Sequence, residues 1–208
     1  MKTYKILIPV FNDWESLFNL LSKIHDLKIN NLGHIKILII DDCSTELLDK
    51  KIEFHSFADI EIIKNSKNVG HGKSIANGIN YLSKKNDFDY LIVMDGDGED
   101  RPEEVKELIL KSIEIPSVTI TANRIKRSES AFFKLSYHLH KILTLVLTGY
   151  SIKFGNFMCI PKQDLNLIVS NKNLFISFSG TVAKFIKNKT DIPSIRGVRY
   201  HGPTKMSF

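Results

Sequence analysis

The segment over residues 91–102 constrains the fold of this chain most. Residues 91–94 are apolar, and residues 95–100 combine two glycines with the carboxylates of Asp95, Asp97, Glu99 and Asp100. A short apolar run that ends at glycine and charge is typical of a strand buried on both faces, as in a parallel sheet. The carboxylates are therefore expected at the tip of a buried strand.

Asp95 and Asp97 are two positions apart in that acidic segment. On an extended backbone their side chains would point the same way and could hold one hard cation, and Gly96 would leave room for a ligand. Mg²⁺ or Mn²⁺ held by one or two carboxylates usually completes its shell with substrate phosphates. The pattern therefore predicts a site for a metal and a diphosphate. The alternative is an acidic turn that caps a helix starting near Pro102.

Length, charge and cysteine content narrow the class of protein. The chain has 208 residues, which predicts a single domain. Its net charge of +6 and its 10% aromatic residues are unlike those of a strongly basic nucleic-acid module. Anionic substrates or a membrane surface both fit this charge. Cys43 and Cys159 lack the spacing of a zinc or redox site, which favours thiols in a reducing cytosol. No export signal is expected, nor an apolar stretch of about 18 residues that could span a membrane.

Strands and helices alternate in the first part of the sequence. Strands are predicted over 4–10, 35–40, 60–64, 90–94 and 118–122, and helices over 14–27, 45–51, 74–85 and 103–113. Such alternation predicts a mostly parallel sheet, in which ligands bind at the carboxyl ends of the strands. Residues 9–13, 41–42 and 95–97 all fall at such ends, so they are expected to meet in one crevice.

The alternation stops after Arg124. A long helical pattern over 131–150 combines large apolar residues with Lys and His, which suits a helix at a membrane interface as well as ordinary core packing. Residues 156–160, helices over 164–169 and 180–187 and a basic tail follow. The later part of the chain therefore follows a different pattern from residues 4–122.

Four motifs occur in an order typical of one family. They are Pro9-Val10-Phe11-Asn12-Asp13, Ile40-Asp41-Asp42-Cys43-Ser44, Asn68-Val69-Gly70-His71-Gly72-Lys73 with Gly78, and residues 94–102. In this the chain resembles family 2 glycosyltransferases of the GT-A fold, and among them the dolichyl- and undecaprenyl-phosphate sugar (mannose or glucose) synthases. The resemblance implies an α/β fold with a Rossmann-like, mostly parallel central sheet flanked by helices. It also implies one domain over 1–208, with a nucleotide-sugar-binding half (1–125) and a smaller acceptor-side half (126–208).

The resemblance assigns roles on the donor side. Pro9, Phe11 and Asp13 would line the base pocket, and Asp42 would accept a hydrogen bond from the nucleotide base. The remaining implied nucleotide-binding residues are Lys73, Asp95 and Gly96. Asp95, Asp97 and Glu99 would be the metal ligands, with Glu99 standing where the family often has an amide.

Basic residues would complete the site. Arg124 matches a family arginine that faces phosphate, and a guanidinium fork suits that anion. The implied catalytic set is Asp95, Asp97 and Arg124, and the implied acceptor or phosphate-binding set is Arg124, Arg127, Arg199 and Lys205. The alternative for Arg124 is a solvated surface charge. Residues 151–157 depart from the family pattern near the acceptor half, and Thr204 replaces the usual Ser of the tail.

The presence or absence of a general base indicates which acceptor the chain would use. A sugar hydroxyl needs a base, and the acids after Glu129 are Asp164, which reads as a helix cap, and Asp191, which reads as a turn residue. His138, His140 or His201 could also serve. A lipid phosphate is already an anion, so the lack of an acidic base motif favours a polyprenyl-phosphate acceptor.

These observations predict a metal-dependent, inverting glycosyltransferase. It would use Mg²⁺ or Mn²⁺, a UDP- or GDP-sugar and a polyprenyl (dolichyl or undecaprenyl) phosphate, in the cytoplasm with peripheral contact at the cytoplasmic face of the membrane, and no nucleic acid. Transfer to a sugar hydroxyl in cell-surface polysaccharide, a nucleotide-sugar-binding module without turnover, and a nucleotidyltransferase are the alternatives. The last normally has a Gly-rich basic loop after its first strand, which this chain lacks, and Lys67 stands where a P-loop requires Gly.

Overall fold

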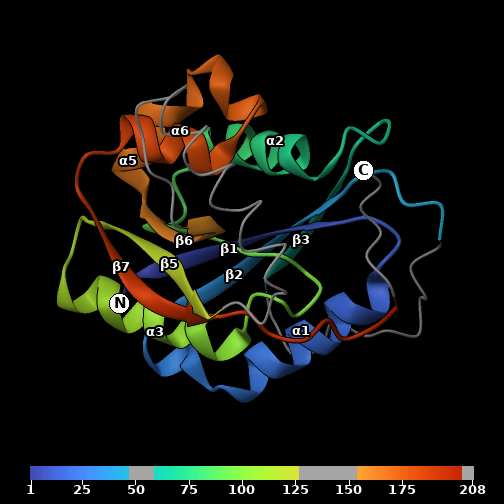
Figure 1. Ribbon diagram of the computed structural model, residues 1–208, viewed down its shortest axis with the longest axis horizontal. Coiled ribbons are helices and arrows are strands. Elements are labelled where there is room, and N and C mark those ends of the chain that lie inside the picture. The colour runs from blue at the N-terminus through green and yellow to red at the C-terminus, as the bar shows by residue number, and fades with distance from the viewer. Residues whose placement is uncertain (47–58, 127–153, 203–208) are drawn as a thin grey trace.

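A computed structural model of the chain describes residues 1–46, 59–126 and 154–202 (Figure 1). The strands are β1 (Thr3–Val10), β2 (His34–Asp41), β3 (Ile60–Lys64), β4 (Tyr90–Val93), β5 (Thr119–Lys126), β6 (Phe154–Pro161) and β7 (Lys189–Ile195). The helices are α1 (Trp14–Asp26), α2 (His71–Ser83), α3 (Pro102–Glu114), α5 (Lys162–Val169) and α6 (Phe178–Phe185), with 3-10 turns η1 (Ile29–Asn31) and η2 (Lys172–Phe175).

The strands form one seven-stranded sheet in the order β3-β2-β1-β4-β6-β5-β7. β1 pairs in parallel with β2 and β4, β2 with β3, and β5 with β7. Within the described chain, β6 alone runs antiparallel to its neighbours β4 and β5. The predicted mostly parallel sheet is confirmed.

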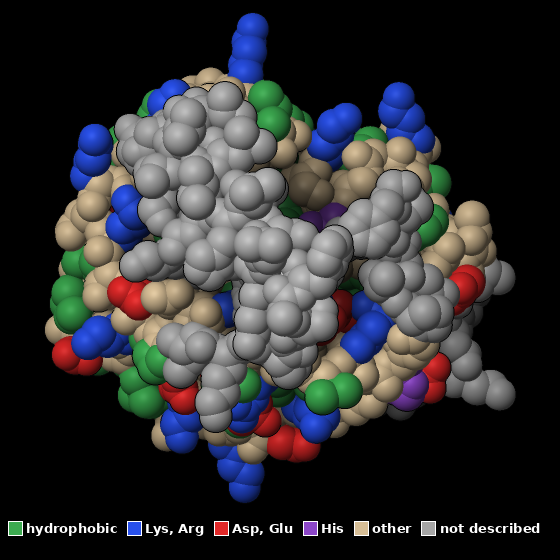
Figure 2. All heavy atoms as spheres, viewed as in Figure 1, with side chains coloured by type: hydrophobic (Ala, Val, Ile, Leu, Met, Phe, Trp, Pro, Cys, Tyr) green, Lys and Arg blue, Asp and Glu red, His purple; other side chains and the backbone are tan. Residues whose placement is uncertain are grey.

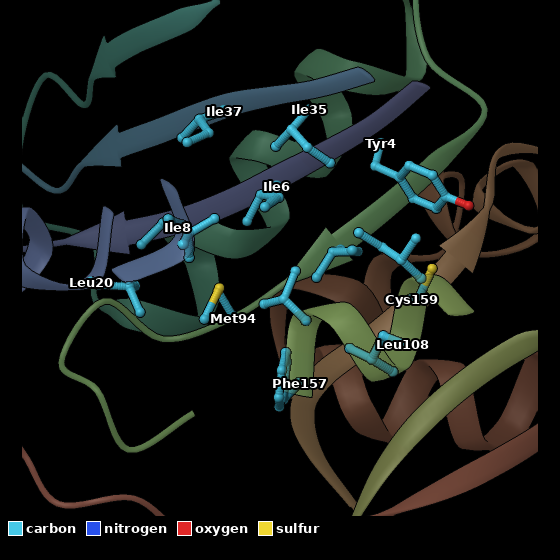
Figure 3. Packing of buried hydrophobic residues seen from close by; sticks show 14 of the residues in the cluster. Tyr4, Ile6, Ile8, Leu20, Ile35, Ile37, Met94, Leu108, Phe157 and Cys159 are labelled. Carbon is cyan, nitrogen blue, oxygen red and sulfur yellow. The ribbon is translucent and has the colours of Figure 1, made fainter. Parts of the chain in front are cut away.

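Helices cover both faces of the sheet, with α1 and α3 on one side and α2, α5 and α6 on the other (Figure 1). Because side chains alternate along a strand, the apolar run of β1 serves both layers. Tyr4, Ile6 and Ile8 join the cluster under α1 and α3, whereas Leu7 joins the cluster under α2, α5 and α6. Figure 3 shows the first of these clusters, in which Leu20 and Leu108 come from the helices and Phe157 and Cys159 come from β6.

Most predicted elements are present, with shifted ends. The helix predicted over 103–113 is α3, which begins at Pro102 with Glu103 and Glu104 in its first turn. β5 continues to Lys126, four residues beyond the predicted end at Ala122. Residues 47–51 of one predicted helix and the whole predicted helix over 131–150 lie outside the described residues.

Two predictions for the last third of the chain are wrong. Asp191 is not a turn residue but lies within β7, opposite Thr121 of β5. Asp164 is not a helix cap but lies in the first turn of α5, where its carboxylate accepts a hydrogen bond from the Thr119 hydroxyl at 2.7 Å. No helix in the described ranges is long and apolar enough to cross a membrane.

The topology brings the predicted site segments to one edge of the sheet. β1 lies between β2 and β4 and runs parallel to both, so the residues that follow these three strands emerge side by side. The predicted site segments therefore meet, as expected for residues 9–13, 41–42 and 95–97. The strand order changes direction between β1 and β4, and sheets of this type bind ligands at that point.

Candidate active site

Asp42 organises one side of the candidate site, which we call the base side because a nucleotide base is predicted to bind there. It is 3% exposed, and its carboxylate accepts hydrogen bonds from the backbone N–H groups of Val69 and Gly70 at 2.9 and 2.8 Å and from Asn65 Nδ2 at 2.9 Å. These three neutral donors fix the loop over 65–70 that leads into α2. A carboxylate offers about four acceptor positions, so Asp42 keeps about one for another donor.

The loops after β1 and β2 are joined by Asn12. Its backbone has a positive φ of 49°, and its side-chain oxygen accepts from the backbone N–H groups of Thr45 and Glu46 at 2.8 and 3.0 Å. Beside it, Pro9 is buried, and Phe11 and Asp13 are half-buried. The structure thus places the predicted base-pocket residues at one edge, while their contact with a base stays a prediction.

The acidic loop, residues 95–100, is not extended as predicted. β4 ends at Val93, and residues 96 and 97 lie in a turn. The Asp97 carboxylate accepts from the backbone N–H of Glu99 at 2.9 Å, and Gly98 has a φ of +92°. A Cβ added at Gly96 would lie 3.1 Å from Ile8 Cγ2, so this glycine lets the loop pack closely on β1.

Asp95 is paired with His71, the first residue of α2. His71 Nε2 lies 2.8 Å from Asp95 Oδ1. Burial disfavours the charged forms of both groups, but their hydrogen bond and mutual attraction outweigh it, so the pKa of His71 is raised and the pKa of Asp95 is lowered. The base-side loop held by Asp42 therefore reaches the acidic loop through His71.

Asp97 and Asp13 share one arginine. Arg199 Nη1 donates to Asp97 Oδ2 at 2.7 Å, and Arg199 Nη2 donates to the Asp13 carboxylate. Burial and then the neighbouring Asp95 and Glu99 charges raise the pKa of Asp97, against the backbone bond from Glu99 and the Arg199 charge. The guanidinium thus joins a predicted base-pocket residue to a predicted metal ligand.

Arg199 belongs to a segment, residues 196–202, that we call the C-terminal strap. It crosses the acidic loop through backbone hydrogen bonds from the Gly197 N–H to the Glu99 oxygen at 2.8 Å and from the Tyr200 N–H to the Asp97 oxygen at 2.9 Å. Arg196 forms an ion pair with Glu99. In Figure 1 this segment follows β7 toward α1.

A buried carboxylate on α3 fixes the point where the strap begins. Glu104 is 3% exposed and accepts from the Ser194 hydroxyl at 2.7 Å and from the Ile195 N–H at 2.9 Å. The end of β7 is therefore attached to the helix that follows the acidic loop.

Asp100 closes the acidic loop. Its Oδ2 accepts from the backbone N–H of Asp95 at 2.9 Å, and its Oδ1 accepts from Arg124 Nη2 of β5 at 3.1 Å. Burial and the nearby Asp95 charge raise the pKa of Asp100 to about 7, in spite of the hydrogen bonds from Asp95 and Arg124.

A divalent metal fits part of the predicted ligand set. Asp95 and Asp97 offer the carboxylate oxygens that Mg²⁺ and Mn²⁺ take, and one or two carboxylates plus phosphates are sufficient for such ions. Glu99 forms an ion pair with Arg196, as Asp97 does with Arg199 and Asp95 does with His71. Among the described residues, no group of three or more His, Cys, Asp and Glu side chains is gathered for a metal, so the three-residue set stays a prediction.

The other predicted residues are spread around this edge. Lys73 is exposed on the first turn of α2, and Arg127 and Lys205 lie outside the described residues. Figure 2 shows that Lys and Arg side chains are distributed around the visible face and lie beside acidic ones at its lower edge. The sequence reasoning missed His71, Asp100 and Arg196, although His71 and Asp100 lie within motifs that it had singled out and Arg196 lies in the basic tail.

Of the candidate general bases in the second half, the two acids, Asp164 and Asp191, lie away from the acidic loop. Asp164 follows Pro161, which pairs with Tyr90 at the start of β4, so it lies toward the opposite edge of the sheet from Asp95. Asp191 accepts from Asn123 Nδ2 at 3.1 Å within the β5–β7 pair. His201 lies in the strap, with Nδ1 3.3 Å from Glu15. His138 and His140 lie outside the described residues.

Comparison with known families identifies the chain. The model of the family described as "Glycosyl transferase family 2" matches residues 5–197. The chain belongs to this family. Curated relatives from Salmonella paratyphi B and Salmonella newport, each an undecaprenyl-phosphate 4-deoxy-4-formamido-L-arabinose transferase, are 29% identical over 219 residues. These alignments cover all of this chain and 64% of the relatives, so the chain spans less than two thirds of their length.

Two solved structures share the fold of this chain. Glucosyl-3-phosphoglycerate synthase from Mycobacterium tuberculosis, in complex with Mn²⁺, UDP and glucosyl-3-phosphoglycerate, has a TM-score of 0.64 at 13% identity, over 97% of this chain and 73% of that one. Mannosyl-3-phosphoglycerate synthase from Rubrobacter xylanophilus has a TM-score of 0.61 at 15% identity, over 97% and 68%. The likeness confirms the predicted GT-A type α/β fold.

Proposed function

We propose that this chain is a metal-dependent, inverting glycosyltransferase that moves a sugar from a UDP- or GDP-sugar to a polyprenyl phosphate. The observation that carries the proposal is the meeting of the acidic loop, the Asp42-held loop and the strap arginines at the carboxyl edge of β1, β2 and β4. The inverting outcome and the cytoplasmic membrane face come from the family resemblance. Residues 1–125 would bind the donor and residues 126–208 the acceptor.

The chemistry of the site supports this reaction. Sugar transfer leaves a nucleotide diphosphate, whose developing charge needs cations. A divalent ion on Asp95 and Asp97 would supply Lewis-acid stabilisation of that leaving group. Arg199, beside Asp97, adds a guanidinium group for the phosphate oxygens of the donor. Arg124, beside Asp100, adds one that suits the phosphate of the acceptor.

The acceptor follows from the acids that are available. Asp164 and Asp191, the acids of the described part after β5, are bonded elsewhere and away from the acidic loop. A phosphate acceptor is already an anion and needs no base. The undecaprenyl-phosphate transferases among the relatives support a polyprenyl phosphate, and the structures with Mn²⁺ and UDP support a metal-bound nucleotide donor.

Calorimetric titration of the purified chain with UDP and with GDP, each with Mn²⁺ and with a chelator, tests the donor site. Metal-dependent binding of one nucleotide is expected, and Asp97→Asn should abolish it while the circular dichroism spectrum stays unchanged. Asp191→Asn, which removes an exposed carboxylate of β7, is the matched control. Equal binding with chelator, or unchanged affinity in Asp97→Asn, would overturn the metal site.

The acceptor is tested by transfer from the donor whose nucleotide binds. Radiolabelled sugar should appear on undecaprenyl phosphate in detergent micelles. Transfer to a saccharide hydroxyl with none to the lipid phosphate would replace the proposed acceptor with the alternative one.

A further inference from the structure

Asp100 differs from the other carboxylates of the acidic loop in its burial. Its side chain is 3% exposed, compared with 27% for Asp95, 20% for Asp97 and 23% for Glu99. Asp95 and Asp97 are the predicted metal ligands, and Glu99 is paired with the strap. Asp100 has no assigned role, yet it is the one that the fold encloses most.

Both oxygens of Asp100 are bound to parts of the site that are far apart in sequence. Oδ2 holds the backbone N–H of Asp95, five residues earlier, and Oδ1 holds the guanidinium of Arg124, 24 residues later. A buried carboxylate is costly unless charged or N–H donors satisfy it, so this pair of bonds fixes Asp100 in one orientation. One rigid group therefore sets the position of Arg124 relative to Asp95.

Arg124 keeps the capacity to bind an anion while it is held. A guanidinium has five N–H donors, and the hydrogen bond to Asp100 uses a donor of Nη2. Next to it lies Gly155 of β6, where an added Cβ would be 3.9 Å from Nη2. The Arg124 side chain is 21% exposed, so it is partly open to solvent. An arginine fixed in advance loses less rotamer freedom when it binds phosphate.

We propose that Asp100 is a positioning residue. It holds Arg124 where that side chain can bind the phosphate of the acceptor, and it fixes the position of Arg124 relative to Asp95. This inference rests on the proposed function, because it takes Arg124 as a phosphate-binding group. Asp100 acts through Arg124 and does not itself touch substrate.

A double-mutant cycle with a soluble acceptor analogue tests this role. Asp100→Asn keeps the shape and one oxygen that can accept from the Asp95 N–H, but its amide N–H₂ faces Arg124 and removes the attraction. The probe is farnesyl phosphate, measured by calorimetry in the wild type, Asp100→Asn, Arg124→Ala and the double variant. Glu103→Gln is the matched control, since it neutralises a neighbouring exposed acid.

Asp100→Asn should weaken farnesyl phosphate binding about tenfold, while Glu103→Gln should stay within about twofold. In the Arg124→Ala background, Asp100→Asn should cause no further loss. A full additional loss in that background, or unchanged binding in Asp100→Asn, would overturn the inference. If Asp100→Asn does not fold, Asp100→Ser, which is smaller, neutral and still an acceptor for the Asp95 N–H, takes its place.

The design separates this inference from the proposed function. Failure of the wild type to bind Mn²⁺ with UDP or GDP would overturn the donor site. Normal nucleotide binding with weakened farnesyl phosphate binding in Arg124→Ala, but not in Asp100→Asn, would leave the proposed function standing and overturn the role of Asp100 alone.

A second readout excludes a merely structural effect. Guanidinium ion added to Arg124→Ala should restore farnesyl phosphate binding, because Asp100 offers it a buried anionic partner. Rescue should be lost in the double variant. Equal rescue in both variants would overturn the inference.

Discussion

The two sides of the candidate site hold their carboxylates by different means. On the base side, Asp42 is enclosed and satisfied by three neutral N–H donors of the loop over 65–70. On the strap side, Asp97 and Glu99 are satisfied in part by arginines, and the Arg196 side chain is 48% exposed. Donors of the folded backbone cannot easily leave, whereas the partly exposed Arg196–Glu99 ion pair is open to exchange with solvent ions. The carboxylate of the base side therefore keeps its donors, whereas the carboxylates of the strap side can exchange their arginine partners for other cations.

Removing Asp42 should have the largest effect on stability. Asp42→Ala leaves the N–H groups of Val69 and Gly70 and the amide of Asn65 without their acceptor, and we expect a loss of roughly 3 kcal/mol or more in the free energy of unfolding. Urea denaturation measures it. Asp59→Ala, at an exposed position, should change stability by at most about 0.5 kcal/mol. Equal effects of the two variants would mean that the base side is no more fixed than the surface.

Removing Arg199 should change metal and nucleotide affinity in opposite directions. A cation that binds Asp97 competes with this guanidinium, so Arg199→Ala should tighten binding of Mn²⁺ alone by roughly three- to tenfold. The same variant should weaken binding of the Mn²⁺–nucleotide pair, since a phosphate partner is lost. Calorimetry measures both. Arg101→Ala, whose partner is Glu103, is the control, and a parallel change in both affinities would contradict an exchangeable Arg199.

Salt should loosen the strap more than the base-side loop. Trypsin can cut after Arg196 and Arg199 in the strap and after Lys67 in the loop held by Asp42. Screening weakens the partly exposed Arg196–Glu99 pair, so cleavage after Arg196 should rise a few-fold between low salt and about 1 M NaCl, whereas cleavage after Lys67 should not. Both sites are followed in one digest by mass spectrometry. Parallel acceleration at both would remove the distinction between the two sides.

The smallest predicted effect concerns a buried carboxylate away from the site. Burial raises the pKa of Asp164, against the lowering effect of its bond from Thr119. The folded chain therefore binds this proton more tightly than the unfolded chain, and Asp164 lowers stability as pH rises from its ordinary pKa near 4 through the raised one. Asp164→Asn should remove that loss, with a gain of at most about 1 kcal/mol at neutral pH. Urea denaturation between pH 4 and 7 measures it, and a gain already present at pH 4 would contradict this linkage.

The sheet and its binding edge were predictable because their signals are local. Apolar runs such as 37–40 and 90–94 indicate buried strands, and the acidic residues directly after them indicate the edge. β7 was missed because it has Lys189, Asp191 and Pro193 among few apolar residues. It is an edge strand, where a proline is tolerated.

The partners within the site were not predictable from spacing. His71 meets Asp95, and Arg199 meets Asp13, across 24 and 186 positions, so only the folded topology brings them together. The acidic loop also turned where an extended backbone was expected, because Asp97 and Asp100 bond to backbone N–H groups of the loop itself. Short acidic side chains close turns in this way as readily as they bind ions.

The fit between Gly98 and Tyr200 has a consequence for the variation of related sequences. A Cβ at Gly98 would lie 2.6 Å from the Tyr200 ring, and the φ of +92° disfavours other residues there as well. A relative that carries a larger residue at position 98 must therefore have a smaller one at 200, or a strap that follows another path. In an alignment of related sequences, covariation between positions 98 and 200 would therefore indicate which members of the family place a strap over the acidic loop as this chain does.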